Sequence, residues 1–170
     1  MKPETKGTIL VLALSIIWKT LLLLTGWVDA GIGKYPLLPV LGFLLIGMYR
    51  SMDERRKLSF SDGIPFKDAF KSGMSVAALF SLTYSLFIYF YLFSIDPAFK
   101  LRFIDNRIIS MKDQNTAPEA IEAWKNSNAN FPFEAFWLVL TFVGILLLGV
   151  FYAAMTSRMM AKKFPVTQSK

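Results

Sequence analysis

Four long runs of apolar residues, separated by polar segments, dominate the pattern of the chain. They cover Gly7 to Val28, Gly31 to Tyr49, Met74 to Ile95 and Phe133 to Ser157. A bilayer has a hydrocarbon core about 30 Å thick, which roughly 20 apolar residues of helix can cross. Each run is close to that length. The pattern therefore predicts an all-α integral membrane protein with four transmembrane helices, forming a single membrane domain over residues 1–170.

Two polar segments connect the predicted spans, an inner loop at 50–73 and a longer outer loop at 96–132. The outer loop contains apolar residues at three- and four-residue steps, namely Leu101, Ile104, Ile108 and Met111. This spacing predicts an amphipathic helix. A second short helix is indicated by a capping box, with Thr116 as N-cap and Glu119 three residues later. We therefore expect a helical, extracytoplasmic loop between the third and fourth spans.

Lys and Arg residues are distributed unequally between the two sides of the predicted spans. Of the 19, twelve lie near the two termini and in residues 50–73, six lie at Lys34 and within 96–132, and the last is Lys19. Positively charged residues that flank short membrane segments stay in the cytoplasm. We therefore expect a multi-pass protein of the bacterial inner membrane, with both termini and the inner loop in the cytoplasm.

Composition restricts the chemistry that the chain can perform. Hydrophobic residues make up 54% of the sequence and its mean hydropathy is +0.44, more than a soluble domain of this size needs. The sequence contains no Cys and no His, which removes thiol nucleophiles, imidazole bases, disulfides and the commonest metal ligands. We expect no enzymatic activity, metal site or cofactor. Because the basic residues lie beside apolar segments, the expected partner is the lipid bilayer and not nucleic acid.

The first apolar run has a second interpretation, as a secretory signal peptide. Lys2 and Lys6 precede it, and Val28 and Ala30 stand where a cleavage site has small residues. Signal-peptide cores are usually only about 7–15 residues long, whereas this run is longer and is interrupted by Lys19. We favour an uncleaved first span, with cleavage as the alternative.

Small residues recur at every fourth position in the third and fourth predicted spans. The two rows consist of Gly73, Ala77, Ser81 and Ser85 in the third, and Gly149, Ala153 and Ser157 in the fourth. Because these spans run antiparallel, the expected level pairs are Gly73 with Ser157, Ala77 with Ala153 and Ser81 with Gly149. Rows of small residues let membrane helices approach closely, so we expect the two helices to touch. The same rows could instead form a homodimer face.

Lys19 is the residue least expected in its surroundings, because it lies near the middle of the first apolar run. At 1.5 Å per residue it is within about 3 Å of the midpoint of that span. A lysine side chain reaches on the order of 6 Å, whereas half of the hydrocarbon core is about 15 Å. Lys19 therefore needs a polar neighbour, and an ionisable residue at this depth is by default a functional hypothesis.

Three roles compete for Lys19. An ion or proton pathway would need a carboxylate at the same depth, but Asp29 lies about 15 Å away along the helix axis. Catalysis by Ser15 as nucleophile and Lys19 as base fits the spacing, but the sequence shows no oxyanion hole or substrate path. In the third role, which we favour, Lys19 is a packing residue that hydrogen-bonds to Ser15, Tyr84 or Ser85.

Three sequence motifs flank the last two spans. FSDGIPFKDAFKSGM leads into the third span, YFYLFSIDPAF ends it, and FPFEAF opens the fourth. With these motifs, nearly the whole chain resembles a family of small four-helix membrane proteins from Bacteroidetes-type bacteria, known as domain of unknown function 4199. The resemblance implies a four-helix membrane fold. It brings no activity, cofactor or catalytic residue, and it assigns no role to any residue.

Together these features favour an accessory or structural membrane protein that works through contacts with lipid or a protein partner. The amphipathic outer loop and the basic inner loop would make these contacts, although the basic residues of 50–73 are also explained as a solvated anchor. A homo-oligomer is compatible with the pattern. The alternative is a small transporter or channel component built around Lys19, which four spans could form only after oligomerisation.

Overall fold

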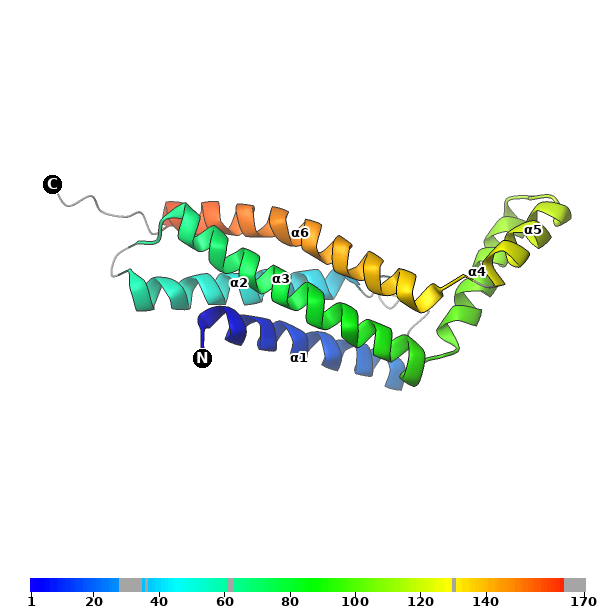
Figure 1. Ribbon diagram of the computed structural model, residues 1–170, viewed down its shortest axis with the longest axis horizontal. Helices are drawn as coiled ribbons and strands as arrows, with labels where there is room; N and C mark the ends of the chain where they lie inside the picture. The colour runs from blue at the N-terminus through cyan, green and yellow to red at the C-terminus, as the bar shows by residue number, and fades with distance from the viewer. Residues whose placement is uncertain (28–34, 36, 61–62, 130, 164–170) are drawn as a thin grey trace. The chain divides into compact units, whose positions relative to one another are not determined.

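The computed structural model describes residues 1–27, 35, 37–60, 63–129 and 131–163, and in these ranges its helices are joined by short turns and irregular segments, with no strand. The elements in chain order are α1 (Pro3–Leu24), α2 (Leu37–Ser59), α3 (Phe66–Phe90), the π-helical turn η3 (Tyr91–Ile95), α4 (Phe99–Asp113), α5 (Pro118–Ala129) and α6 (Phe133–Lys163) (Figure 1). The all-α fold predicted from the sequence is confirmed.

Three of the described helices are long and apolar enough to cross a membrane. They are Pro3–Leu24, Phe66–Ile95 and Phe133–Lys163, which correspond to the first, third and fourth predicted spans. In α2 the apolar part runs only from Leu37 to Tyr49, roughly 20 Å of helix. Residues 31–34 and 36 of the predicted second span lie outside the described residues. A fourth transmembrane helix therefore stays a prediction.

Helical structure occupies much of the segment 50–73 that the hydrophobic pattern assigned to a loop. The α2 helix continues past Tyr49 to Ser59, and α3 begins at Phe66, before the predicted start of the third span. The continuation of α2 consists largely of strong helix formers such as Met, Glu, Arg and Lys. It carries ion pairs at i,i+3 and i,i+4, which stabilise exposed helices.

The chain divides into two compact units. The first comprises Met1–Tyr84 and Phe142–Lys170, and the second Ser85–Thr141. Helices α3 and α6 contribute residues to both units. The expectation of a single membrane domain stays a prediction.

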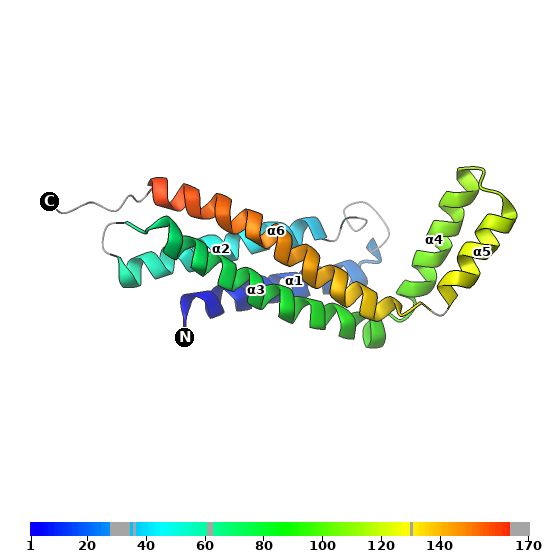
Figure 2. The same cartoon turned by 45° about the horizontal axis from the view of Figure 1, so that its top comes forward.

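In the first unit α1, α2 and the adjoining parts of α3 and α6 lie side by side, with successive helices running in opposite directions (Figures 1 and 2). Each helix contributes to the buried core, for example through Val11, Leu44, Phe80 and Ile145. Apolar side chains also cover much of the outer surface, as in Ile17, Leu82 and Val150. Such surfaces are expected where lipid is the solvent.

Glycines bring the backbones of α1 and α2 into direct contact. A Cβ atom added to Gly7 would lie 2.8 Å from the carbonyl oxygen of Gly47, and one added to Gly47 would lie 3.0 Å from the carbonyl oxygen of Gly7. These distances leave no room for a side chain on either residue. The two helices therefore pack backbone against backbone, as small residues permit in membrane bundles.

The second unit contains the end of α3, η3, a hairpin formed by α4 and α5, and the first turns of α6 (Figure 2). Asn115 adopts a positive φ of 54° in the turn between α4 and α5, a conformation that asparagine tolerates. Because α5 begins at Pro118, the N-cap position falls on Ala117. The predicted capping box, with Thr116 as N-cap, is therefore displaced by one residue.

Candidate functional site

The small-residue rows of α3 and α6 meet in the first unit. A Cβ atom on Gly149 would lie 2.6 Å from the Cβ of Ala77, and one on Gly73 would lie 3.1 Å from the Cβ of Ala153. Gly73 therefore faces Ala153, whereas the sequence predicted that it would face Ser157. Ala77 likewise faces Gly149 and not the predicted Ala153. The contacts are displaced by four residues from the expected register, about 6 Å along a helix.

Methionines of α2 pack against this contact between α3 and α6. Met52 is fully buried, its methyl group lies beside Gly73, and its sulfur lies 3.9 Å from the Ser157 hydroxyl. The methyl group of Met48 lies 3.8 Å from the Cβ position of Gly149. Side chains of α2 thus fill space that a pairing of α3 with α6 alone would leave open. The level pairing expected from sequence took no account of these side chains.

Ser81, the next member of the α3 row, is buried. Its hydroxyl donates a hydrogen bond to the carbonyl oxygen of Ala78, 3.0 Å away. The hydroxyl is therefore satisfied within its own helix. A serine bonded in this way acts as a small packing residue.

The residues predicted around Lys19 are all wholly or partly shielded from solvent. Lys19 itself is half-buried on α1, one turn after Ser15. The buried Ser15 hydroxyl donates to the carbonyl oxygen of Val11 at 2.8 Å. Tyr84 and Ser85 are 2% and 1% exposed, and Ser85 belongs to the second unit. Hydrogen bonds from Lys19 to Ser15, Tyr84 or Ser85 stay predictions.

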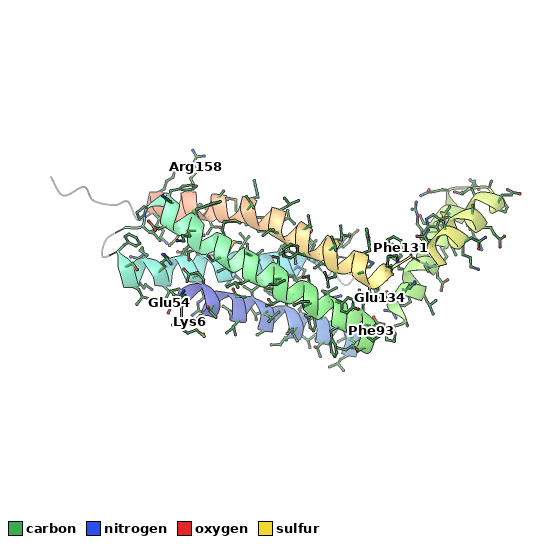
Figure 3. All side chains as sticks on the ribbon, viewed as in Figure 1. Lys6, Glu54, Phe93, Phe131, Glu134 and Arg158 are labelled. Carbon is green, nitrogen blue, oxygen red and sulfur yellow. The ribbon has the colours of Figure 1, made fainter. Side chains whose placement is uncertain are left out.

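Two ion pairs join α1 to α2, and the sequence pattern did not reveal either. Arg55 Nη1 donates to Glu4 Oε1 at 2.7 Å, and Lys6 pairs with Glu54 (Figure 3). The Glu4 side chain is only 9% exposed and that of Arg55 30%, whereas those of Lys6 and Glu54 are 47% and 36% exposed. The first pair is therefore much better shielded from water than the second.

A buried hydrogen bond between Ser51 and Ser72 extends this polar end of the bundle to α3. Their hydroxyl oxygens are 2.9 Å apart, and both residues are at most 1% exposed. Thr8, also buried, donates to the carbonyl oxygen of Glu4 at 2.9 Å. The hydroxyl groups of Thr8, Ser51 and Ser72 are therefore matched by partners from neighbouring turns or helices, as burial requires.

Carboxylates also form ion pairs with basic residues of the predicted inner loop. Asp53 accepts from Lys57 at 2.7 Å and from Arg56 at 2.9 Å. The hydrogen bond from Lys57, with that from Arg56, holds the pKa of the Asp53 carboxyl below its usual range. Arg55, Arg56 and Lys57 are thus paired with carboxylates, while Arg158 of α6 points away from the bundle (Figure 3). This arrangement favours an anchoring role for the cluster.

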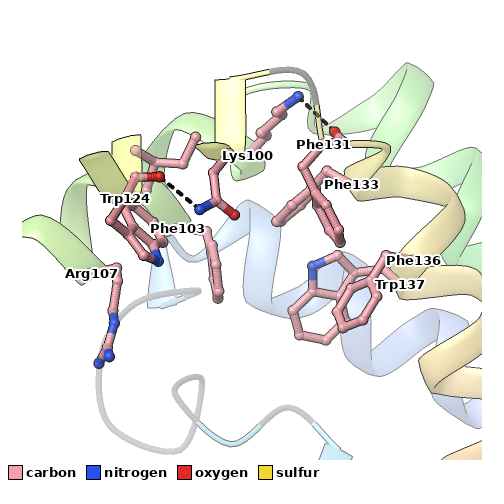
Figure 4. A pocket seen from close by; sticks show the side chains of 10 residues that line it. Lys100, Phe103, Arg107, Trp124, Phe131, Phe133, Phe136 and Trp137 are labelled. Atoms are coloured by element: carbon pink, nitrogen blue, oxygen red, sulfur yellow. Dashed lines mark hydrogen bonds between the residues drawn. The ribbon is translucent and has the colours of Figure 1, made fainter. Parts of the chain in front are cut away.

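The second unit contains a cavity of about 290 Å³ between α4, α5 and the first turns of α6 (Figure 4). Six of its ten lining residues are aromatic, two are the bases Lys100 and Arg107, and none is acidic. Lys100 Nζ donates to the carbonyl oxygen of Phe131 over 3.4 Å. The cavity therefore combines apolar walls with positive charge.

Comparison with known families gives a match over residues 6–162 to the family described as "Protein of unknown function (DUF4199)". This is nearly the whole chain. The chain belongs to the DUF4199 family. The family resemblance inferred from the motifs is confirmed, and no function comes with it. Comparison with curated proteins and with solved structures finds no match.

Sequence reasoning about this DUF4199 protein missed the cavity, although one signal was present. Phe99 and Phe103 stand at i,i+4 in α4, and Phe133 and Trp137 stand at i,i+4 in α6. Such pairs place aromatic rings on one helix face. The rings of the two pairs pack against one another with centroids 5.4–6.1 Å apart.

Proposed function

We propose that this DUF4199 protein is an accessory or structural protein of a bacterial inner membrane, which crosses the membrane four times and acts through contacts with lipid or a protein partner. It does not act as an enzyme. The observation that carries the proposal is the tight closure of the bundle. Backbones meet at Gly7 and Gly47, and the α3–α6 seam closes at Gly149. Contacts of this kind make the helix bundle rigid, which suits a structural role better than a transport cycle.

The fourth crossing uses α2 together with the residues that precede it. A span from Gly31 to Tyr49 would measure roughly 28 Å at 1.5 Å per residue, close to the thickness of the hydrocarbon core. Arg50 then marks the cytoplasmic end of the span, followed by the charged turns of α2. The excess of Lys and Arg near both termini and in residues 50–73 supports a cytoplasmic location for these segments.

Single-cysteine labelling tests this topology, because the natural sequence has no cysteine to remove. The variants Tyr35→Cys, Ser59→Cys and Asn115→Cys introduce one thiol each at exposed positions. A membrane-impermeant maleimide applied to intact spheroplasts should label Y35C and N115C, and should label S59C only after lysis. Labelling of Y35C and S59C from the same side would contradict a membrane-crossing α2.

Purification in mild detergent, followed by reconstitution, tests the functional part of the proposal. A stoichiometric partner, or tightly retained lipid, would support action through contacts. Saturable uptake of a solute or ion by proteoliposomes, abolished in Lys19→Leu, would replace the proposal with the transporter alternative. The control is Thr20→Leu, an exposed neighbour of Lys19 on the same helix.

A further inference from the structure

The walls of the cavity in the second unit are apolar and preformed. The rings of Phe103 and Phe133 lie 5.4 Å apart between centroids, and those of Phe131 and Phe136 lie 5.2 Å apart in an edge-to-face arrangement. Phe103 and Phe136 are nevertheless 41% and 45% exposed. The protein thus leaves aromatic surface uncovered around a space that it does not fill, as in binding pockets for apolar groups.

The charges around the cavity all have the same sign. Lys100 and Arg107 are seven residues apart on α4, which places them on one helix face about 10 Å apart along the axis. In contrast, Arg102 on the same helix forms a two-point ion pair with Asp96, at 2.6 and 3.1 Å. No acidic residue lines the cavity. An anion is therefore the complementary ligand for Lys100 and Arg107.

Trp137 adds an unsatisfied hydrogen-bond donor. Its indole Nε1 is buried and has no hydrogen-bond partner in the part of the chain that the structure describes. Trp137 lines the cavity together with Phe103 and Phe133 (Figure 4). A buried donor without a partner is unfavourable, and an oxygen atom of a ligand would satisfy it.

The size of the cavity and its place in the sequence restrict the ligand further. About 290 Å³ is near the lower limit for ligand pockets and too small for the two chains of a phospholipid. Phe133, Phe136 and Trp137 belong to the first turns of α6, one of the three helices able to cross a membrane. A ligand dissolved in the bilayer interface can therefore reach the cavity.

We propose that this cavity binds an anionic lipid with a single acyl chain, whose head carries a carboxylate or a phosphate. Lys100 and Arg107, which lie on either side of Phe103 (Figure 4), attract the head by their positive charge. The aromatic rings contact the first methylene groups, and the remainder of the chain extends into the bilayer. The inference rests on the proposed function in one respect, that α6 crosses the membrane.

Tryptophan quenching by brominated lipids tests the proposal with the full chain in nanodiscs of zwitterionic phosphatidylcholine. The background Trp18→Phe, Trp27→Phe leaves only Trp124 and Trp137, which both line the cavity. The probes are a dibrominated fatty acid, a lysophosphatidic acid with the same dibrominated chain, and the matching neutral fatty alcohol. The three probes are compared at equal mole fractions in the bilayer.

Saturable quenching is expected with at least one of the anionic probes, at a mole fraction at least tenfold lower than the alcohol requires. The relative affinities of the two anions decide between a carboxylate and a phosphate head. In Lys100→Gln, Arg107→Gln the half-saturating fraction should rise at least tenfold. The matched control Lys112→Gln, Lys125→Gln removes two exposed bases of α4 and α5 that do not line the cavity, and it should change the affinity less than twofold.

A second variant tests the cavity without changing its charge. Ile104→Phe places a larger side chain at a lining position and should weaken binding of both anions at least fivefold. Quenching that rises linearly with every probe, or that is equal in the K100Q/R107Q variant and its control, would overturn the proposal. The cysteine labelling in intact spheroplasts reports the topology separately, so that failure of the binding proposal and failure of the proposed function can be distinguished.

Discussion

The basic residues of α2 and those of α4 differ in what faces them. Arg55 is bound by Glu4 of another helix, and Arg56 and Lys57 are bound by Asp53 of their own helix. Lys100 and Arg107 instead line a cavity that has aromatic walls and no acidic residue, and Lys100 makes only a long hydrogen bond, 3.4 Å, to the carbonyl oxygen of Phe131. Bases of the first kind hold the fold together, whereas bases of the second kind are available to a ligand.

The same contrast holds for packing in the two units. In the first unit, glycines and small side chains let neighbouring helices approach closely, as at Gly7 with Gly47 and at Gly149 with Ala77. The second unit encloses a space that its own residues do not fill. Stability and binding should therefore respond to substitutions in different parts of the chain, and each prediction below tests one side of this division.

The largest effect should come from enlarging Gly149. Gly149→Leu forces a side chain against Ala77, where even a Cβ atom would lie within 2.6 Å. Overpacking of this kind should lower the free energy of unfolding by about 1–3 kcal/mol. The matched control is Gly144→Leu on the same helix, where nothing lies within 4 Å of an added Cβ. Thermal unfolding in detergent measures the stability of both variants. Equal losses of stability at the two positions would contradict the close contact of α3 and α6 at Gly149.

A smaller loss is expected when Glu4 loses its charge. Glu4→Gln leaves the partly buried guanidinium of Arg55 without its ionised acceptor. This should lower the free energy of unfolding by about 1–2 kcal/mol, as hydrogen bonds to charged groups do. Glu54→Gln, the control at the exposed pair with Lys6, should change it by only about 0.5 kcal/mol or less. A larger loss in E54Q than in E4Q would reverse our assignment of the structural pair.

The smallest effect concerns pH and Asp53. The folded state lowers the pKa of this carboxyl below its ordinary value of 3.8. Asp53 therefore contributes stability that is fully present above that value and is lost as the pH falls through the folded pKa. At pH 7 the natural protein should melt at a higher temperature than Asp53→Asn. The two melting temperatures should converge as the pH falls below about 3.8. A difference in melting temperature that increases in acid would contradict a lowered pKa for the Asp53 carboxyl.

The hydrophobic pattern was sufficient to predict the helical class and the three long apolar helices, because each apolar run is long enough to cross a bilayer. It missed the continuation of α2 to Ser59, because those residues are charged and are helical through pairs such as Asp53 with Lys57. A hydrophobicity pattern cannot distinguish a charged helix from a loop.

Features that depend on contacts between distant parts of the chain could not be predicted from the sequence. Met52 of α2 packs against the contact between α3 and α6, and the Glu4–Arg55 pair joins residues 51 positions apart. The cavity forms only where α6 returns to α4 after the hairpin. The candidate residues around Lys19 were named from depth alone, which predicts proximity along the membrane normal and not a hydrogen bond.

The central claim is that bases paired within the bundle are structural and bases facing the cavity are available to a ligand. It is tested most directly by measuring stability and anionic-lipid binding together in Arg55→Gln and Arg107→Gln. We predict that R55Q lowers the melting temperature and keeps the natural affinity for the brominated anionic lipid. R107Q should keep the melting temperature and weaken binding several-fold. Loss of binding in R55Q with no loss in R107Q would contradict the claim.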